Sequence, residues 1–500
     1  MVLHGTVQNA LGGVRGVREV AMPGKAVDDF VKTYLSALRE DNAAVFAGAG
    51  LSIPAGLVDW RALLRDIAND IDLDVDRETD LVSVAQFHVN ERGGRHRINQ
   101  ALVTEFAERA TLSENHKLLA SLPITTYWTT NYDTLIEQAL RAAHKRPDVK
   151  STVKNLAITV PRRDAVVYKM HGDVAHPDSA IVTRDDYEAY GETHRLFAAA
   201  LQGDLVSKTF LFVGFSFSDP NLSFVLGRIR VLLGENRREH FCFLRRVAMR
   251  DFASTAECEY ARARQELQVR DLRRYGIIGL LLDDYSEYTN VIRRLVTLYR
   301  RGRVFVSGSG ESFDPWSISE AQAFIRELGH RVVQAGFDLV SGFGLGVGSS
   351  LLNGVLDALD EQGSYSLHDR VILRPFPQGV VDPAERAARW TSYRREMVAH
   401  AGIALFLFGN RQAPDGALQR ATGVEEEFVL AAEAGLAVVP LGATGYMAAE
   451  LHGRVLKEFD RYYPGRGTLR AQFEELGRAA EPRSLLERTI SFLTRLREEP

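Results

Sequence analysis

The chain has 500 residues, of which 45% are apolar and 25% charged, and its formal net charge is −4. This length exceeds what one hydrophobic core usually serves, so we expect two or three domains with the composition of an ordinary globular protein. The charge balance gives no electrostatic basis for a nucleic-acid partner.

The sequence contains only two cysteines, Cys242 and Cys258. Two cysteines are too few for a disulfide framework or a four-cysteine zinc site, so we expect no zinc. The opening residues lack the charged and apolar regions of a signal peptide, and no apolar run approaches the roughly 20 residues of a membrane helix. The sequence therefore predicts a cytoplasmic protein with no membrane partner.

The first half alternates short β-rich runs with helical patterns. Strands are expected at 43–47, 124–128, 165–169, 209–213 and 241–244, and helices at 60–71 and 133–143. Apolar strands separated by helices are typical of βαβ units and of a buried parallel sheet.

The second half restarts this alternation after a helical stretch at 288–301. Strands are expected at 304–306, 337–340, 371–373, 403–408 and 437–441. The predicted fold class is α/β, with two doubly wound Rossmann-like parallel-sheet domains at 1–295 and 300–500 that carry helical insertions. Most glycine clusters fall at the carboxyl ends of strands, where open α/β sheets bind ligands.

The segment Gly48-Ala49-Gly50-Leu51-Ser52 follows the first strand and precedes a helical pattern. Its bare backbone can approach a pyrophosphate while the amino end of the helix supplies N–H donors. The dehydrogenase fingerprint requires a third glycine where Ile53 stands, which disfavours that class. Taken alone, the segment fits a tight turn without a ligand equally well.

Three further segments end strands of the first half: Thr129-Thr130-Asn131-Tyr132-Asp133, His171-Gly172 and Gly214-Phe-Ser216-Phe-Ser-Asp219. In this order, and with the glycine segment, they resemble the sirtuin superfamily over residues 25–290. The resemblance implies that Asn131 lies beside the nicotinamide ribose and that His171 is the catalytic base. It also implies that NAD is contacted by Gly48, Ala49, Gly50, Ser52, Asp59, Thr130, Asp133, Gly214 and Ser216.

These residue types suit cleavage of the nicotinamide–ribose bond, which develops oxocarbenium character on the sugar. An asparagine amide offers a donor and an acceptor, and a histidine can take a proton from a ribose hydroxyl or from water. Sirtuin deacylases carry paired cysteines after the His-Gly segment, whereas residues 173–210 contain none. The resemblance without that zinc module implies water as the acceptor, and so an NAD+ glycohydrolase that uses NAD+ as substrate and needs no cofactor.

In the second half, Ser307-Gly308-Ser309-Gly310, the glycine array at 341–349, and the segments around Arg394 and Glu426 resemble the SLOG superfamily of nucleotide-binding domains. Backbone N–H groups and an arginine can contact phosphates, and a glutamate can bind ribose hydroxyls. The expected activator-binding residues are Gly308, Ser309, Gly344, Gly346, Gly348, Arg394, Arg395, Glu426 and Glu427. The sequence does not choose between the two arginines or between the two glutamates.

A sirtuin-like domain fused to a SLOG domain resembles the NAD-consuming effectors of the Thoeris antiphage system. That resemblance implies activation by a cyclic ADP-ribose isomer from a TIR-domain protein, and a homo-oligomer, either a tetramer or a filament. Two alternatives stay open: the SLOG domain is itself a nucleotide phosphoribohydrolase, or the chain is a non-catalytic NAD-binding scaffold. The sequence also leaves open whether residues 1–24 serve assembly or cover a site.

Overall fold

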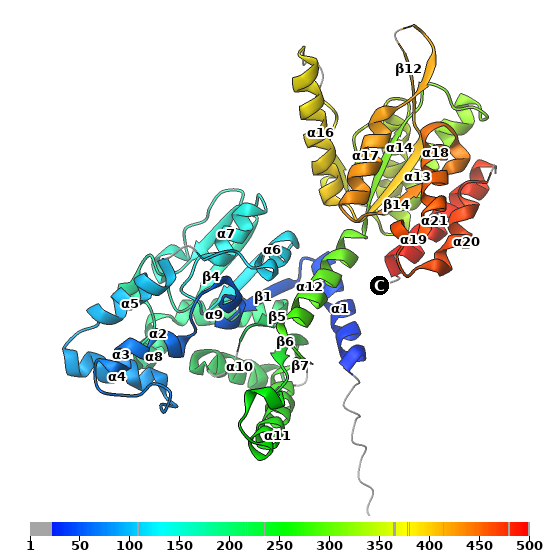
Figure 1. The fold of residues 1–500 in the computed structure, drawn as a ribbon. Coiled ribbons are helices and arrows are strands. Elements are labelled where there is room, and N and C mark those ends of the chain that lie inside the picture. Colours follow the sequence, from blue (N-terminus) through cyan, green and yellow to red (C-terminus); the bar gives the residue numbers. More distant parts are fainter. Residues whose placement is uncertain are drawn as a thin grey trace, which may run out of the picture. The chain divides into compact units, whose positions relative to one another are not determined.

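The computed structural model describes residues 23–107, 110–215, 217, 219–234, 236–363, 367–377, 379, 381–413, 415–478 and 481–498. The chain divides into two compact units between Ile292 and Arg293. Each unit is built on a parallel β-sheet with helices around it (Figure 1), so the predicted α/β class with two doubly wound domains is confirmed. The question about residues 1–24 concerns a segment that lies almost wholly outside the described residues.

The first unit contains a seven-stranded parallel sheet with the order β3-β4-β2-β1-β5-β6-β7. Its strands are β1 (Ala43–Ala47), β2 (Thr126–Thr129), β3 (Pro147–Lys150), β4 (Ala165–Lys169), β5 (Thr209–Val213), β6 (His240–Arg245) and β7 (Ile277–Leu282). The chain winds from β1 toward β2, β4 and β3, and then crosses to β5 on the other side of β1. The carboxyl ends of β1 and β5 therefore form the switch point at which open α/β sheets bind ligands.

Two strands of this sheet escape prediction from the sequence, and both lie at its edges. The first, β3, begins with Pro147 and carries the charged residues Asp148 and Lys150, which have low strand propensity but are tolerated at an edge. The second, β7, is an apolar run that local sequence does not distinguish from a buried helix segment.

Helices cover both faces of the first sheet. They are α1 (Pro23–Arg39), α7 (Leu135–Ala142), α8 (Arg184–Thr193), α9 (Arg195–Ser207), α10 (Pro220–Leu233), α11 (Thr255–Leu272) and α12 (Tyr285–Arg300). On one face, Phe46 and Phe212 of neighbouring strands share a core cluster with Phe197 of α9. On the other, Phe30 of α1 packs against Phe241, with ring centroids 5.1 Å apart. Burial on both faces explains why these strands are near-continuous apolar runs.

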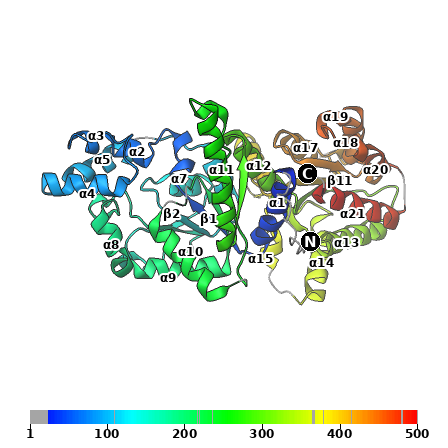
Figure 2. The same ribbon diagram turned by 90° about the horizontal axis from the view of Figure 1, so that it is seen from below.

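A helical insertion separates β1 from β2. It comprises α2 (Trp60–Leu63), α3 (Arg65–Asn69), α4 (Leu81–Arg92), α5 (His96–Ala107) and α6 (Glu114–Ser121). The single helix predicted at 60–71 is two short helices, because Leu64, with ψ of 0°, interrupts it. Helices α2–α5 and α8 lie together at one end of the unit (Figures 1 and 2). Polar contacts join them: Asp80 to Arg184 at 2.5 Å, Gln86 to Asp185 at 3.0 Å and Arg95 to Asp186 at 3.0 Å.

The second unit contains a five-stranded parallel sheet with the order β10-β9-β8-β11-β14. All five predicted strands are present, as β8 (Arg303–Ser309), β9 (Asp338–Ser341), β10 (Val371–Leu373), β11 (Ile403–Phe408) and β14 (Ala437–Pro440). The antiparallel hairpin of β12 (Asn410–Gln412) and β13 (Leu418–Arg420) was not predicted. The switch point of this sheet lies between β8 and β11.

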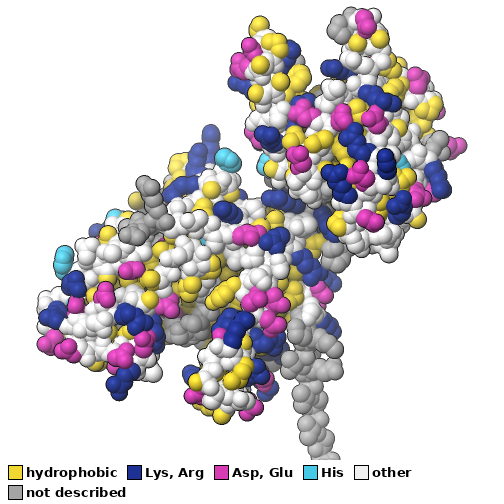
Figure 3. All heavy atoms as spheres, in the orientation of Figure 1, with side chains coloured by type: hydrophobic (Ala, Val, Ile, Leu, Met, Phe, Trp, Pro, Cys, Tyr) yellow, Lys and Arg dark blue, Asp and Glu magenta, His cyan; other side chains and the backbone are white. Residues whose placement is uncertain are grey.

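The helices of the second unit alternate with these strands. They are α13 (Ile318–Gln334), α14 (Gly348–Glu361), α15 (Leu367–Arg370), α16 (Pro383–His400), α17 (Thr422–Glu433), α18 (Tyr446–Lys457), α19 (Phe459–Tyr462), α20 (Arg470–Glu475) and α21 (Pro482–Glu498). No helix within the described ranges is long and apolar enough to cross a bilayer. On the face seen in Figure 3, basic and acidic side chains are interspersed over both units.

Candidate active site

A cavity of about 670 Å³ opens in the first unit at the carboxyl ends of β1, β2, β4 and β5. Every predicted NAD-site residue within the described ranges lines it, namely Gly48, Ala49, Gly50, Ser52, Asp59, Thr130, Asn131, Asp133, His171 and Gly214. The remaining predicted residue, Ser216, lies outside the described residues. The sheet topology thus brings together motifs that are far apart in sequence, at the switch point of the fold.

The floor of this cavity is made of backbone in close contact. A Cβ on Gly48 would lie 2.4 Å from the carbonyl oxygen of Gly214, and a Cβ on Gly214 would lie 2.2 Å from the amide nitrogen of Leu51. Gly214 also has φ of +65°, in the left-handed region. Only glycine fits where two backbones approach this closely.

The glycine segment does not lead directly into the predicted helix. Two single 3-10 turns follow instead, at Ala49–Leu51 and Ile53–Ala55, and the second ends at Gly56 with φ of +94°. The next α-helix begins at Trp60, as predicted. A helix macrodipole therefore does not add to phosphate binding at this loop, because single turns lack the aligned peptide dipoles of a longer helix.

Hydrogen bonds hold the Asn131 side chain in one orientation. Its Nδ2 donates to the carbonyl oxygen of Gly48 at 3.0 Å and to Ser52 Oγ at 3.1 Å. Ser52 Oγ donates in turn to Asp133 Oδ2 at 2.8 Å, and since a carboxylate only accepts, the direction of this chain is fixed. Both N–H groups of the amide are therefore in use, and Oδ1 is the atom that Asn131 offers to a ligand.

His171 is buried beside a carboxylate. Its Nε2 lies 3.1 Å from Asp219 Oδ2, although the two are not aligned as a regular hydrogen bond. Burial raises the pKa of Asp219, but the charge of His171 and hydrogen bonds from backbone N–H groups, including that of Leu222, outweigh it and leave this pKa lowered. The ring of Tyr187 packs against the imidazole, with centroids 5.5 Å apart. The imidazole thus lies beside a carboxyl group whose lowered pKa favours the ionised form.

Asp219 and Tyr187 were not predicted as site residues, although both line the cavity. Asp219 stands directly before Pro220 at the start of α10, an N-cap signal that was readable in the fourth motif. Tyr187 belongs to α8 and has no motif around it. The apolar wall contributed by the insertion also escaped prediction: Val58, Trp60, Leu63, Leu81, Val82 and Phe106.

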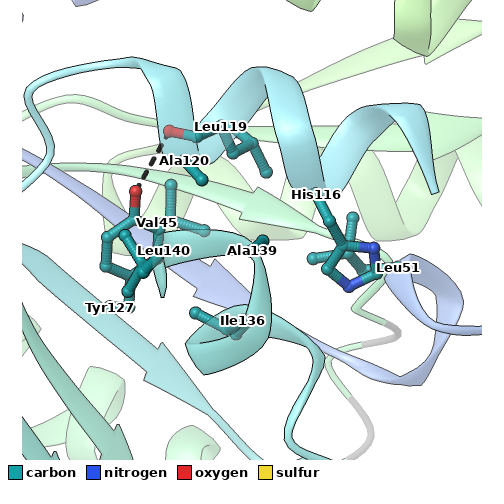
Figure 4. Close-up of a pocket in the computed structure, with 9 residues that line it drawn as sticks. All are labelled: Val45, Leu51, His116, Leu119, Ala120, Tyr127, Ile136, Ala139 and Leu140. Atoms are coloured by element: carbon teal, nitrogen blue, oxygen red, sulfur yellow. Dashed lines mark hydrogen bonds between the residues drawn. The ribbon is translucent and has the colours of Figure 1, made fainter. Parts of the chain in front are cut away.

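A closed cavity of about 10 Å³ lies among β1, β2, α6 and α7 (Figure 4). His116 of α6 lies beside Leu51 there, and Tyr127 donates to the carbonyl oxygen of Leu119 at 3.0 Å. Burial lowers the pKa of His116 to about 4, against the opposing attraction of Asp133. This space holds about one water at most, so it belongs to the packing of the unit and not to a substrate site.

In the second unit, Arg394 of α16 is buried between the two predicted glutamates of α17. Its Nη1 lies 2.8 Å from Glu426 Oε2, and its Nε lies 3.4 Å from Glu427 Oε1. Its guanidinium carbon lies 4.9 Å from the centroid of the Phe376 ring. Arg395, the next residue, is exposed. The two arginines therefore have different environments, and of the two Arg394 is the one that contacts the glutamates.

Glu427 is the most deeply buried carboxyl group of this cluster. It accepts a hydrogen bond from Ser307 at the end of β8. Burial raises its pKa, although the Ser307 hydroxyl and the charge of Arg394 act in the opposite direction. The Arg394 cluster is thus tied to the switch point between β8 and β11.

The glycine array after β9 has a packing explanation. A Cβ on Gly344 would lie 2.0 Å from the carbonyl oxygen of Gly308, and one on Gly346 would lie 2.1 Å from that of Gly310. A Cβ on Gly348 would lie 2.8 Å from the Phe343 backbone. Contact between two loops therefore accounts for these glycines without a nucleotide. Of the other predicted residues, Ser309 donates to the carbonyl oxygen of Asn410 at 3.0 Å.

Comparison with known proteins gives each unit a family. The profile of the SIR2-like domain matches residues 125–269, and that of the Sir2- and TIR-associating SLOG family matches residues 287–496. The chain is 47% identical over 440 residues to "NAD(+) hydrolase ThsA" of Bacillus cereus (strain MSX-D12), which covers 88% of this chain and 91% of the relative.

Two further relatives carry the same name. That of Cytobacillus dafuensis is 42% identical over 476 residues, covering 93% of this chain and 96% of its own. That of Acinetobacter baumannii (strain 532279) is 43% identical over 458 residues, covering 90% of this chain and 95% of its own. With this identity over nearly the full length, and with a SIR2-like domain followed by a SLOG domain, the chain belongs to the ThsA family.

Proposed function

We propose that this chain hydrolyses NAD+ to nicotinamide and ADP-ribose in the cavity of the first unit. Its relatives are named NAD(+) hydrolases and match it along nearly their full length. The observation that carries the proposal is the presence in one cavity of Asn131, whose amide is fixed from behind, and His171, which is paired with Asp219.

The reaction breaks the bond between C1′ of the ribose and the pyridinium nitrogen of nicotinamide. Nicotinamide leaves as a neutral molecule with the bonding electron pair, so it needs no proton from a general acid. This differs from glycosidases, which protonate their leaving group and therefore use two carboxyl groups. Positive charge develops on the ribose, and the oriented Oδ1 of Asn131 accepts a hydrogen bond from the attacking water and directs its oxygen to C1′.

The proton of that water goes to His171. The imidazole can accept this proton, and its Nε2 lies 3.1 Å from Asp219 Oδ2. Asp219 then stabilises the imidazolium that forms. NAD+ and water thus yield nicotinamide, ADP-ribose and a proton, and the scheme uses neither a metal nor an organic cofactor.

We further propose that the second unit regulates this activity by binding a cyclic ADP-ribose isomer made by a TIR-domain protein. The description of the matched family as Sir2- and TIR-associating supports a TIR-domain source. In this proposal the chain acts as a homo-oligomer, a tetramer or a filament, and depletes NAD+ in antiphage defence. An unrestrained NAD+ hydrolase would deplete its own cell, which is a reason to attach a sensor.

The test is nicotinamide release by the full chain, with and without a panel of cyclic ADP-ribose isomers. We expect one isomer to raise the rate and His171→Ala to abolish it. NAD+ binding without release under every condition would overturn the proposal in favour of a scaffold. Turnover of nucleoside monophosphates that persists in the His171→Ala protein would instead support a phosphoribohydrolase in the second unit.

A further inference from the structure

Lys169, the last residue of β4, is a wholly buried lysine close to the proposed site. Its Nζ donates to the carbonyl oxygen of Tyr132 at 3.0 Å and to that of Asp133, and it lies 2.5 Å from Asp173 Oδ2. The side chain is 0% exposed. An ammonium group has three N–H donors, so these three acceptors satisfy it completely.

The three acceptors belong to two different loops. Tyr132 and Asp133 follow Asn131 in the loop after β2, whereas Asp173 follows His171 in the loop after β4. A backbone hydrogen bond from Val174 to the Tyr132 carbonyl oxygen, at 3.0 Å, makes a second connection between the same loops. The Lys169 ammonium thus bonds both to the loop that carries Asn131 and to the loop that carries His171.

Glu137 of α7 is the fourth oxygen-bearing group near this ammonium, at 3.4 Å. Burial raises the pKa of Glu137, although the charge of Lys169 lowers it. Asp173 Oδ2 lies 2.5 Å from Nζ, whereas Glu137 Oε1 lies 3.4 Å away, so Asp173 is the nearer of the two carboxyl groups. The carboxyl group that pairs with the Lys169 ammonium at hydrogen-bond distance is therefore that of Asp173.

We propose that Lys169 is a positioning residue for NAD+ cleavage: by joining the loop of Asn131 to the loop of His171, it fixes the separation of these two side chains. The inference rests on the proposed roles of Asn131 and His171. Misplacing a reacting group by about 1 Å can lower the rate about 10²-fold without removing any group that contacts the substrate. Loss of the Lys169 contacts that join the two loops should therefore lower kcat and leave NAD+ binding nearly intact.

Lys150 provides a matched control in the same sheet. It is also a buried lysine, paired with Asp148 at 2.9 Å and donating to the carbonyl oxygen of Ile158, but it lies on the edge strand β3 and does not line the cavity. Removal of either ammonium breaks a buried ion pair and destabilises the fold, although Asp148 keeps a second partner, Arg163, at 2.7 Å. Only the loss of Lys169 should also change the geometry of the site.

The experiment compares kcat and KM for nicotinamide release by the full chain, with and without added cyclic ADP-ribose, in four variants. Lys169→Met should lower kcat by about 10- to 100-fold with KM changed less than about threefold. Asp173→Asn, which keeps the shape and removes the charge, should fold and lower kcat by about 3- to 10-fold. Glu137→Gln and Lys150→Met should leave kcat unchanged.

The double variant Lys169→Met with Asp173→Asn separates positioning from stability. It removes both members of the ion pair, so its melting temperature should rise above that of Lys169→Met while kcat stays low. Recovery of kcat together with stability would overturn the proposal, as would equal kcat values in Asp173→Asn and Glu137→Gln. If His171→Ala retained activity, the proposed function itself would fail; loss of activity there with wild-type kcat in Asp173→Asn would refute only the role of Lys169.

Discussion

Asn131 in the first unit and Arg394 in the second are both buried and both held by neighbouring groups. They differ in whether the atoms that would contact a ligand are already bonded to the protein. Asn131 is bonded from behind by Gly48 and Ser52, which leaves its Oδ1 for a ligand. Arg394 directs its guanidinium at Glu426 and Glu427, the residues expected to share its ligand. The first arrangement is organised in advance for one reaction.

The second arrangement must exchange partners before Arg394 can hold a phosphate. An anionic ligand has to replace carboxylates that already satisfy the arginine, so its binding and the rearrangement of the Arg394 cluster are coupled. Such a site suits a sensor, since a ligand shifts an equilibrium only by its different affinity for the two states. In the proposed function, the first site is therefore fixed before its substrate binds, whereas the second changes its contacts when its ligand binds.

Asn131→Asp should give the largest effect and would break the first half of this comparison. The substitution is nearly isosteric, but it places an acceptor against the carbonyl oxygen of Gly48 in place of a donor. We expect kcat/KM for NAD+ to fall by about 10²- to 10³-fold with the fold retained. Nicotinamide release and thermal melting of the variant measure the two outcomes, and a loss smaller than tenfold would mean that the orientation of this amide is unimportant.

Asp219→Asn tests whether the Asp219 carboxylate beside His171 is needed for the reaction. Asparagine is an equally good N-cap, so α10 should remain intact. Loss of the negative charge beside the imidazole should lower kcat by about 10- to 100-fold. Asp204→Asn is the control, since this carboxylate bonds to Trp128 at 2.8 Å and does not line the cavity. Equal losses in both variants would contradict the role of Asp219.

Arg394→Met addresses the second unit, with Arg395→Met as its adjacent control. If Arg394 holds the activator, its loss should raise the half-activating concentration of the effective cyclic ADP-ribose isomer by about 5- to 150-fold. Arg395 is exposed and should change it less than about twofold. Activation curves of nicotinamide release give both values. Similar shifts in the two variants would show that the buried pairing does not mark the binding residue.

The smallest effect concerns stability in acid. Burial lowers the pKa of His116 from 6.5 to about 4, so between these values the unfolded chain binds a proton that the folded chain does not. His116 should therefore make the free energy of unfolding fall as the pH drops below 6.5, with a contribution of up to about 1.4 kcal/mol per pH unit that levels off near pH 4. Denaturant unfolding of the full chain at several pH values measures the slope. His116→Gln should make this slope shallower. An unchanged slope would mean that other groups cause the loss of stability in acid.

Much of the fold could be predicted because most strands of the two parallel sheets are apolar runs. The strands at 43–47, 165–169, 209–213, 371–373 and 403–408 have the predicted bounds. The strands without a prediction lie at sheet edges or in a hairpin, where partial exposure weakens the apolar pattern, as in β3 and β13. Local sequence did not reveal that the segment after Gly50 would form single turns, because the left-handed bend at Gly56 depends on backbone conformation.

The site could be predicted as a set of motifs but not as a set of contacts. Asn131 and His171 were found because each follows a strand and belongs to an ordered series. Their supporting contacts, from Ser52 to Asn131 and from Lys169 to Tyr132, join residues 79 and 37 positions apart. Only the order of the strands in the sheet brings such pairs together, and no spacing in the sequence encodes it.

The contact of Gly48 and Gly50 with Gly214 limits how such an enzyme can diversify. Any side chain at these positions would collide with main-chain atoms across the switch point, so the floor of the cavity has almost no freedom to change. The opposite wall comes from the insertion between β1 and β2, where Val58, Leu81 and Phe106 contribute ordinary side chains. Substrate preference can therefore change more readily by substitution in the insertion than in the glycine floor, and directed evolution toward other dinucleotides should concentrate its libraries in the insertion.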